Sequence, residues 1–188
     1  MYDWCGPIGL ATGRLVYAER HGVGPPLLLV PGVGGDCGLF SQIVDALAAE
    51  FTVVTFDRYG CSRSQMGSAE RHIPTALDHA ADSAALLAEM ELDRGTVFGT
   101  GPSVDVALAL AERYPERLRR LVLHEPWPMS DQTQWPAWRH GISDLVRVAE
   151  TNFGVRAARE QLMRLLIGDS ATNELMPDVF GAAAAESI

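Results

Sequence analysis

Residues 96–126 read TVFGTGPSVDVALALAERYPERLRRLVLHEP, and this stretch decides the fold. Its first residues, Thr96 to Phe98, form a short apolar run that predicts a buried strand. A glycine-rich turn follows, and apolar residues at helical spacing predict a helix over Ser103 to Tyr114. Leu118 to Leu123 predicts the next strand. A strand, a helix and a second strand in this order indicate two parallel strands joined by a helical crossover.

The same alternation extends toward the N-terminus. Strands are predicted over Arg14 to Glu19, at the edge of the sheet, and over the apolar runs Leu27 to Val30 and Phe51 to Phe56. Helices are predicted over Phe40 to Glu50 and Ala76 to Met90. Buried strands joined by amphipathic helices predict an α/β fold, in which a parallel sheet carries helices on both faces.

Composition excludes several classes of function. The 188 residues suit one domain, and 47% hydrophobic with 21% charged residues is typical of a globular protein. A net charge of −9 argues against a nucleic-acid partner, because phosphate binding favours a basic surface. No apolar run approaches the ~20 residues that a membrane span needs. Lysine is absent, which rules out a Schiff base or a P-loop lysine.

Cysteine usage indicates the cellular setting. Cys5, Cys37 and Cys61 form neither an even set nor a Cys-x-x-Cys pair, so neither a disulfide framework nor a zinc site is expected. Residues 1–10 lack the basic and apolar regions of a signal peptide. We therefore expect a cytoplasmic protein with no metal and no cofactor, whose partner is a small-molecule or peptide substrate.

Four blocks of the sequence resemble, in order and spacing, successive blocks of α/β-hydrolase-fold proteins. The resemblance covers about residues 10 to 170 and implies an α/β-hydrolase-like sheet with flanking helices and a partial helical cap. It implies a core over residues 1–126 and, in the same domain, a cap-like region and tail over residues 127–188. The blocks are PLLLVPG at 26–32, FDRYGCSRS at 56–64, VFGTG at 97–101 and YPERLRRLVLHEP at 114–126.

The resemblance also implies where such a protein carries its nucleophile, the serine of a Gly-x-Ser-x-Gly turn between strand and helix. Aligned on Pro115, the elbow helix of the family places this position at Gly101, so no acyl-enzyme can form there. The next residue, Pro102, lacks the backbone N–H that normally contributes to the oxyanion hole. One such donor is typically worth about 3 kcal/mol in the transition state. The other donor is expected from Val33, after Gly32.

The last blocks of the family, which carry the triad acid and the catalytic histidine, have no counterpart here. The resemblance therefore implies a divergent member with its C-terminal part missing. Ser103 is either a displaced nucleophile or the N-cap of the helix. His124 and His140 are candidate bases, and Glu125 is a candidate relocated acid. His124 and Glu125 can equally form a turn or a capping element.

Further residues are expected around a substrate site at the carboxyl ends of the strands. Cys37 and Cys61 lie in two such loops, and each is either a thiol nucleophile or a small packed residue. Three tryptophans after residue 126 either line a pocket for an aromatic or peptide-like ligand or fill the core of the cap. The expected binding residues are Gly32, Val33, Cys37, Gly101, Pro102, Trp127, Trp135 and Trp138.

Three functions stay open. The first is a non-hydrolytic step of natural-product biosynthesis on a small or peptide-like substrate: epimerisation, cyclisation or acyl transfer. The second is an esterase or a carrier-to-product acyltransferase that uses Ser103 or a cysteine. The third is a non-catalytic binding or scaffold subunit, in which an exposed sheet edge pairs with a second copy as a homodimer. Gly99 and Gly101 also match part of a dinucleotide fingerprint, but Val104 replaces its third glycine.

Overall fold

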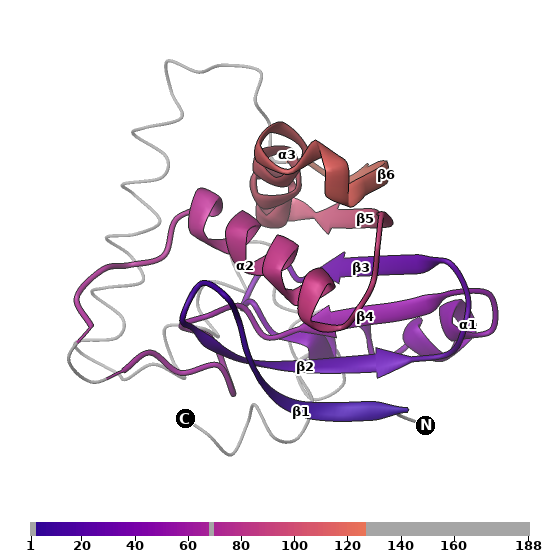
Figure 1. Cartoon of the computed structure of the whole chain (residues 1–188), viewed down its shortest axis with the longest axis horizontal. Helices are drawn as coiled ribbons and strands as arrows, with labels where there is room; N and C mark the ends of the chain where they lie inside the picture. The colour runs from indigo at the N-terminus through magenta and orange to yellow at the C-terminus, as the bar shows by residue number, and fades with distance from the viewer. Residues whose placement is uncertain (1–2, 68–69, 127–188) are drawn as a thin grey trace, which may run out of the picture. The chain divides into compact units, whose positions relative to one another are not determined.

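The computed structural model describes residues 3–67 and 70–126, and Figure 1 shows how their helices and strands are arranged. These residues form a six-stranded sheet in the order β1-β2-β4-β3-β5-β6. The strands are β1 Trp4–Gly9, β2 Leu15–His21, β3 Pro26–Val30, β4 Thr52–Phe56, β5 Gly95–Thr100 and β6 Leu118–His124. The helices are η1 Cys37–Phe40, α1 Val44–Ala48, α2 Ala76–Glu89, η2 Gly101–Ser103, α3 Val104–Arg113 and η3 Pro115–Arg117.

Most of the sheet is parallel, as the sequence predicts. β4, β3, β5 and β6 pair in parallel, and β1 and β2 join them in antiparallel pairs. The strand predicted over Arg14 to Glu19 corresponds to β2. The prediction that it lies at the edge of the sheet is wrong, because β2 pairs with β1 on one side and with β4 on the other. The sequence hides β1 because Gly6, Pro7 and Gly9 all disfavour strands. The α/β class itself is confirmed.

The central strands are buried on both faces, which explains their continuous apolar runs. Leu28 and Val30 point into a core that also contains residues of α2 and α3. Leu27 and Leu29 point the other way and pack in a second core with Val44 of α1. Figure 1 shows α2 and α3 lying together on one face of the sheet. The chain therefore has the layered architecture that the alternating pattern predicts.

Two predicted helices compare differently with the structure. α2 begins where the sequence predicts, because Thr75 and Asp78 form a capping box at its first turn. The helix predicted over residues 40–50 is shorter and follows a separate turn, η1. The side chain of Asp36 accepts a hydrogen bond from the Gly38 N–H at 2.6 Å, so the first turn begins before Phe40.

Several predictions lie outside the described residues. These include the cap-like region and tail over residues 127–188, with Trp127, Trp135, Trp138 and His140. Among the residues that the structure does describe, no helix is long and apolar enough to cross a bilayer.

Candidate functional site

A sharp turn joins β5 to α3 at the edge of the sheet where the parallel strands end. Gly101 stands at its apex with a φ of +54°, in the left-handed region that glycine adopts readily and other residues rarely do. Pro102 follows in a single 3-10 turn, and α3 starts at Val104. A strained strand-to-helix turn is the geometry of a nucleophile elbow, and the residue at this apex has no side chain.

Glycines bring three elements into close contact around this elbow. A Cβ at Gly32, after β3, would lie 2.4 Å from the Thr100 carbonyl oxygen and 3.4 Å from Pro102 Cδ. A Cβ at Gly99 would lie 2.9 Å from Ala107 Cβ and 2.9 Å from the Ser103 carbonyl oxygen. Real Cβ atoms do not approach backbone oxygens this closely, so only glycine lets the loop after β3 and the start of α3 pack here.

The loop after β3 is also held from its other side. Arg58 donates a hydrogen bond from Nη2 to the Gly32 carbonyl oxygen at 2.8 Å. Val33, the expected source of an oxyanion donor, follows directly and is half-buried. Gly32 therefore lies beside Thr100 and Pro102, and a substrate-binding role of Gly32 and Val33 stays a prediction.

Ser103 is completely buried beneath the elbow. Its hydroxyl accepts a hydrogen bond from the Thr100 N–H at 2.8 Å, and its single proton lies within donating distance of the carbonyl oxygens of Val30, at 2.7 Å, and Thr100, at 3.0 Å. It makes no capping hydrogen bond to α3. The hydroxyl is thus fully used in tying the elbow to β3, and its partners among the described residues are backbone groups rather than a histidine.

His124 comes to the elbow from the neighbouring strand, because the end of β6 pairs with the end of β5. Its Nδ1 lies 3.1 Å from Thr100 Oγ1, and its ring stacks on Phe98 with centroids 6.0 Å apart. When Nδ1 donates to Thr100, Nε2 is the basic nitrogen. His124 is exposed, so its ring is oriented by two contacts and still reachable from solvent.

Glu125 follows His124 in an uncommon conformation. Its φ is +47°, and its side chain is exposed. Non-glycine residues with positive φ are rare and cluster at functional sites and turns. The two candidate residues are therefore adjacent at the end of β6, with His124 in contact with the residue before Gly101.

Cys37 lies in a buried cluster behind the loop after β3. Its N–H donates to Asp57 Oδ1 at 2.9 Å, and its Sγ accepts from Arg63 Nη2 at 2.8 Å. Burial raises the pKa of the Cys37 thiol, and the charges of Asp57 and Glu19 raise it further. The thiol stays protonated at ordinary pH, which suits a packed residue and not a nucleophile.

The same cluster contains a potential metal-ligand set. Ligand atoms of Asp36, Cys37 and Asp57 lie within 4.8 Å of one another. The guanidinium of Arg63 already lies among them, with Nε 2.6 Å and Nη2 2.9 Å from the carboxylate oxygens of Asp57. Burial opposes the charge of Arg63, but its hydrogen bond to Asp57 and the negative groups around it raise the pKa of the guanidinium. Arg63 therefore supplies the positive charge of this cluster.

The remaining cysteine of these loops also packs closely. A Cβ at Gly35 would lie 2.5 Å from Cys61 Sγ, and Gly35 itself has a φ of +65°. Burial lowers the pKa of neighbouring Arg58. Cys61 is half-buried and lies against the glycine-rich loop.

Sequence reasoning missed Thr100 and Arg63. Thr100 orients His124 and donates its N–H to Ser103, and its position before the apex glycine was the available signal. Arg63 contacts Asp57 across a loop, and no local spacing predicts such a contact.

Comparison with known proteins points to one family. The family model described as "alpha/beta hydrolase fold" matches residues 25–188. An uncharacterized hydrolase, YraK, of Bacillus subtilis is 35% identical over 114 residues, which are 61% of this chain and 42% of that protein. A zearalenone hydrolase of Bionectria ochroleuca is 34% identical over 120 residues, 63% of this chain and 46% of that protein. The chain thus spans less than half the length of these relatives.

Solved structures agree on the fold. A thermophilic esterase from Thermogutta terrifontis matches with a TM-score of 0.73 at 20% identity, covering 97% of this chain and 68% of the esterase. A protein described in connection with ring-cleavage of the Pseudomonas quinolone signal matches with a TM-score of 0.72 at 18% identity, covering 97% of this chain and 69% of that one. Identities this low bear on the fold alone.

Proposed function

Because the chain belongs to the alpha/beta hydrolase fold family, whose model matches residues 25–188, we propose that it binds a small or peptide-like substrate at the elbow without forming an acyl-enzyme. The proposed partner is thus a small molecule or a peptide, in a cytoplasmic setting. One observation carries the proposal: Gly101, at a φ of +54°, occupies the apex where this fold carries its nucleophile.

The residues around the apex support the same proposal. Pro102 offers no N–H, so the oxyanion hole has lost one of its two usual donors. Losing one such donor lowers kcat by about 10²–10³ in a serine protease. The hydroxyl of Ser103 is fully bonded in the interior, and the thiol of Cys37 is buried and protonated. Neither Ser103 nor Cys37, two of the nucleophiles considered from the sequence, is therefore open to a substrate at the elbow.

Proton transfer is the chemistry that these groups suit best. His124 is exposed and oriented by Thr100, so Nε2 can accept a proton from a substrate bound above Gly101. The Val33 N–H is the proposed donor to a substrate carbonyl oxygen, which would make an adjacent C–H more acidic. Epimerisation needs this base to remove a proton from one face of the substrate and a water molecule to return a proton on the opposite face. Cyclisation needs a base and a bound orientation, whereas acyl transfer here requires direct attack by a second substrate.

Hydrolysis is the second candidate, because relatives such as the zearalenone hydrolase carry hydrolase names. It requires Ser103 or a cysteine to attack, or His124 to activate water directly. A third candidate is a non-catalytic subunit that forms a homodimer. It draws support from β6, which pairs with β5 and exposes 44% of Val122 and 39% of Leu123.

Deuterium exchange tests the leading proposal. The full chain is incubated in D₂O with a panel of N-acyl amino-acid esters and lactones, and NMR follows both loss of the α-proton and hydrolysis. We expect exchange without hydrolysis, lost in His124→Gln and kept in Arg119→Gln, an exposed control on the same strand. Hydrolysis without exchange would favour the second candidate. Neither reaction with any member of the panel would favour the third.

A further inference from the structure

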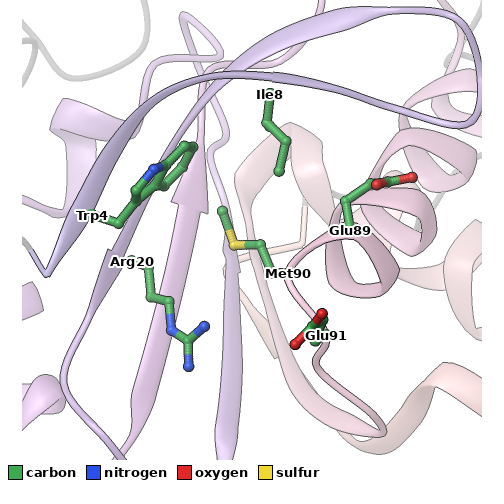
Figure 2. Close-up of a pocket in the computed structure, with 6 residues that line it drawn as sticks. All are labelled: Trp4, Ile8, Arg20, Glu89, Met90 and Glu91. Carbon is green, nitrogen blue, oxygen red and sulfur yellow. The ribbon is translucent and has the colours of Figure 1, made fainter.

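A hollow of about 410 Å³ opens on the β1–β2 side of the sheet, next to the end of α2. It shares no lining residue with the elbow. Figure 2 shows Trp4, Ile8 and Met90 around its middle, with Arg20 and Glu91 toward one side. The lining residues are Trp4, Ile8, Arg20, Glu89, Met90 and Glu91. The volume lies in the range of pockets that bind small molecules.

The strand pattern explains why the hollow exists. Trp4, Gly6 and Ile8 alternate along β1 and share one face of the sheet. Gly6 adds no side chain between the other two, and a Cβ there would touch the Trp4 ring at 3.7 Å. The register places Arg20 of β2 directly opposite Trp4. Two apolar side chains and one guanidinium therefore border space that the middle of β1 leaves open.

The end of α2 closes the opposite wall. Met90 is 7% exposed and packs into the main core, so its thioether is held in place. The chain then reverses at Glu91, whose φ of +55° is uncommon for a non-glycine residue. This turn places Glu91 among the lining residues, with Glu89 one residue before Met90, and Figure 2 draws both glutamates on the side of the hollow away from Trp4. The apolar middle is thus bordered by one positive and two negative side chains.

These charges are available to a ligand. Among the described residues, neither the Arg20 guanidinium nor the carboxylates of Glu89 and Glu91 take part in a hydrogen bond or ion pair with another side chain. Trp4 is 40% exposed, an unusual exposure for an indole on a short edge strand. An apolar or aromatic group would cover the indole and Met90, while opposite charges on the ligand would meet the rim.

We propose that this hollow binds an aromatic α-amino acid, free or at the end of a peptide. Its ring would lie against Trp4, Ile8 and Met90, its carboxylate on Arg20, and its ammonium between Glu89 and Glu91. A ligand with only a carboxylate would face two like charges, and one with only an ammonium would face Arg20. The zwitterion satisfies both ends of the rim. The site is independent of the function proposed for the elbow.

Calorimetry with L-phenylalanine tests the site, with phenethylamine and 3-phenylpropionate as probes that each lack one charge. We expect phenylalanine to bind and both analogues to bind at least about tenfold more weakly. Arg20→Gln and Trp4→Ala should each weaken binding by about tenfold or more, whereas Arg119→Gln should leave it unchanged. Circular dichroism and thermal melts establish that each variant is folded, and both substituted side chains are at least partly exposed, so folding should persist.

Three results would overturn the proposal. One is no saturable heat with phenylalanine at millimolar concentrations. Another is phenethylamine or 3-phenylpropionate binding as tightly as phenylalanine, which would make the hollow a simple ion-pairing surface. The last is a change of oligomeric state in Trp4→Ala, measured by sedimentation, without any amino-acid binding, which would assign the face to a second copy of the chain.

Discussion

The Ser103 hydroxyl donates a hydrogen bond to the Val30 carbonyl oxygen at 2.7 Å, so the residue that follows Pro102 belongs to the interior and joins α3 to β3. The same oxygen accepts a hydrogen bond from the Thr100 N–H. A hydroxyl with these partners stabilises the elbow, and it is not positioned to attack a substrate above Gly101.

Ser103→Ala should therefore destabilise the fold. It leaves the Thr100 N–H and the Val30 carbonyl without their buried partner, which costs about 1–3 kcal/mol. Urea unfolding measures the free-energy change, with Val23→Ala as a control, because Val23 is 89% exposed and its truncation should stay within about 0.5 kcal/mol of the wild type. An unchanged midpoint in Ser103→Ala would show that the hydroxyl does not stabilise the elbow.

Gly32→Ala should disturb the elbow from the side of β3. The new Cβ would lie 2.4 Å from the Thr100 carbonyl oxygen, and backbone on both sides must shift to relieve the contact. We expect a loss of about 1–3 kcal/mol in unfolding free energy. Gly9→Ala is the matched control, because nothing lies within 4 Å of its Cβ position. Equal stability of the two variants would contradict the packing described here.

Arg63→Met should be severely destabilising. It leaves the fully buried carboxylate of Asp57 without the guanidinium that donates to both its oxygens, a loss of about 3–5 kcal/mol for a broken buried pair. Adding Asp57→Asn should restore part of that stability. Arg119→Met, at an exposed position, is the control in the same denaturation experiment. If Arg63→Met unfolds at the midpoint of the control, the pair contributes nothing.

Thiol labelling should separate the cysteines of the native protein. Burial and neighbouring negative charge raise the pKa of the Cys37 thiol, so it forms less thiolate at a given pH than an exposed cysteine does. Iodoacetamide should modify exposed Cys5 first and Cys37 only after unfolding, as mass spectrometry of digested protein will show. Rapid labelling of Cys37 in the folded chain would return it to the list of candidate nucleophiles.

Stability should fall on acidification through the pH range in which His79 titrates. Burial lowers the pKa of His79 to about 4, and the positive charges of Arg58 and Arg14 act in the same direction, while Asp78 opposes them. The unfolded chain takes up this proton near pH 6.5, before the folded chain does. The contribution of His79 to the free energy of unfolding is therefore fully present above pH 6.5. It decreases between pH 6.5 and pH 4, by on the order of 3 kcal/mol.

Substitution isolates this contribution. In His79→Gln, the difference in unfolding free energy from the wild type should change between pH 6.5 and about 4 and be constant above that range. Parallel curves for the two proteins would show that His79 does not titrate abnormally.

Sequence patterns predicted the strands far better than the site. Runs such as Leu27 to Val30 are apolar at every position because both faces of the sheet are covered. A continuous apolar run of this length therefore predicts a strand in the middle of the sheet. β1 was not predicted, because its glycines and its proline have low strand propensity. Its pairing with β2 nevertheless stabilises the strand.

Site geometry depends on contacts that no local pattern encodes. The glycine at the apex could be read from the sequence, but the burial of Ser103 depends on β3, seventy-three residues away in the chain. The contact of His124 with Thr100 likewise follows from the pairing of β6 with β5, a tertiary property. Residues such as Cys37 could be placed in the correct loop, yet their chemical character depends on burial beside Asp57 and Arg63.

The central claim is that the elbow forms no covalent intermediate. Treating the full chain with a fluorophosphonate probe and measuring its intact mass tests this most directly, with an active serine hydrolase labelled in parallel. The account predicts that the mass stays unchanged in both the wild type and Ser103→Ala. A wild-type mass increased by one phosphonyl group, mapped to Ser103 and absent from Ser103→Ala, would contradict it.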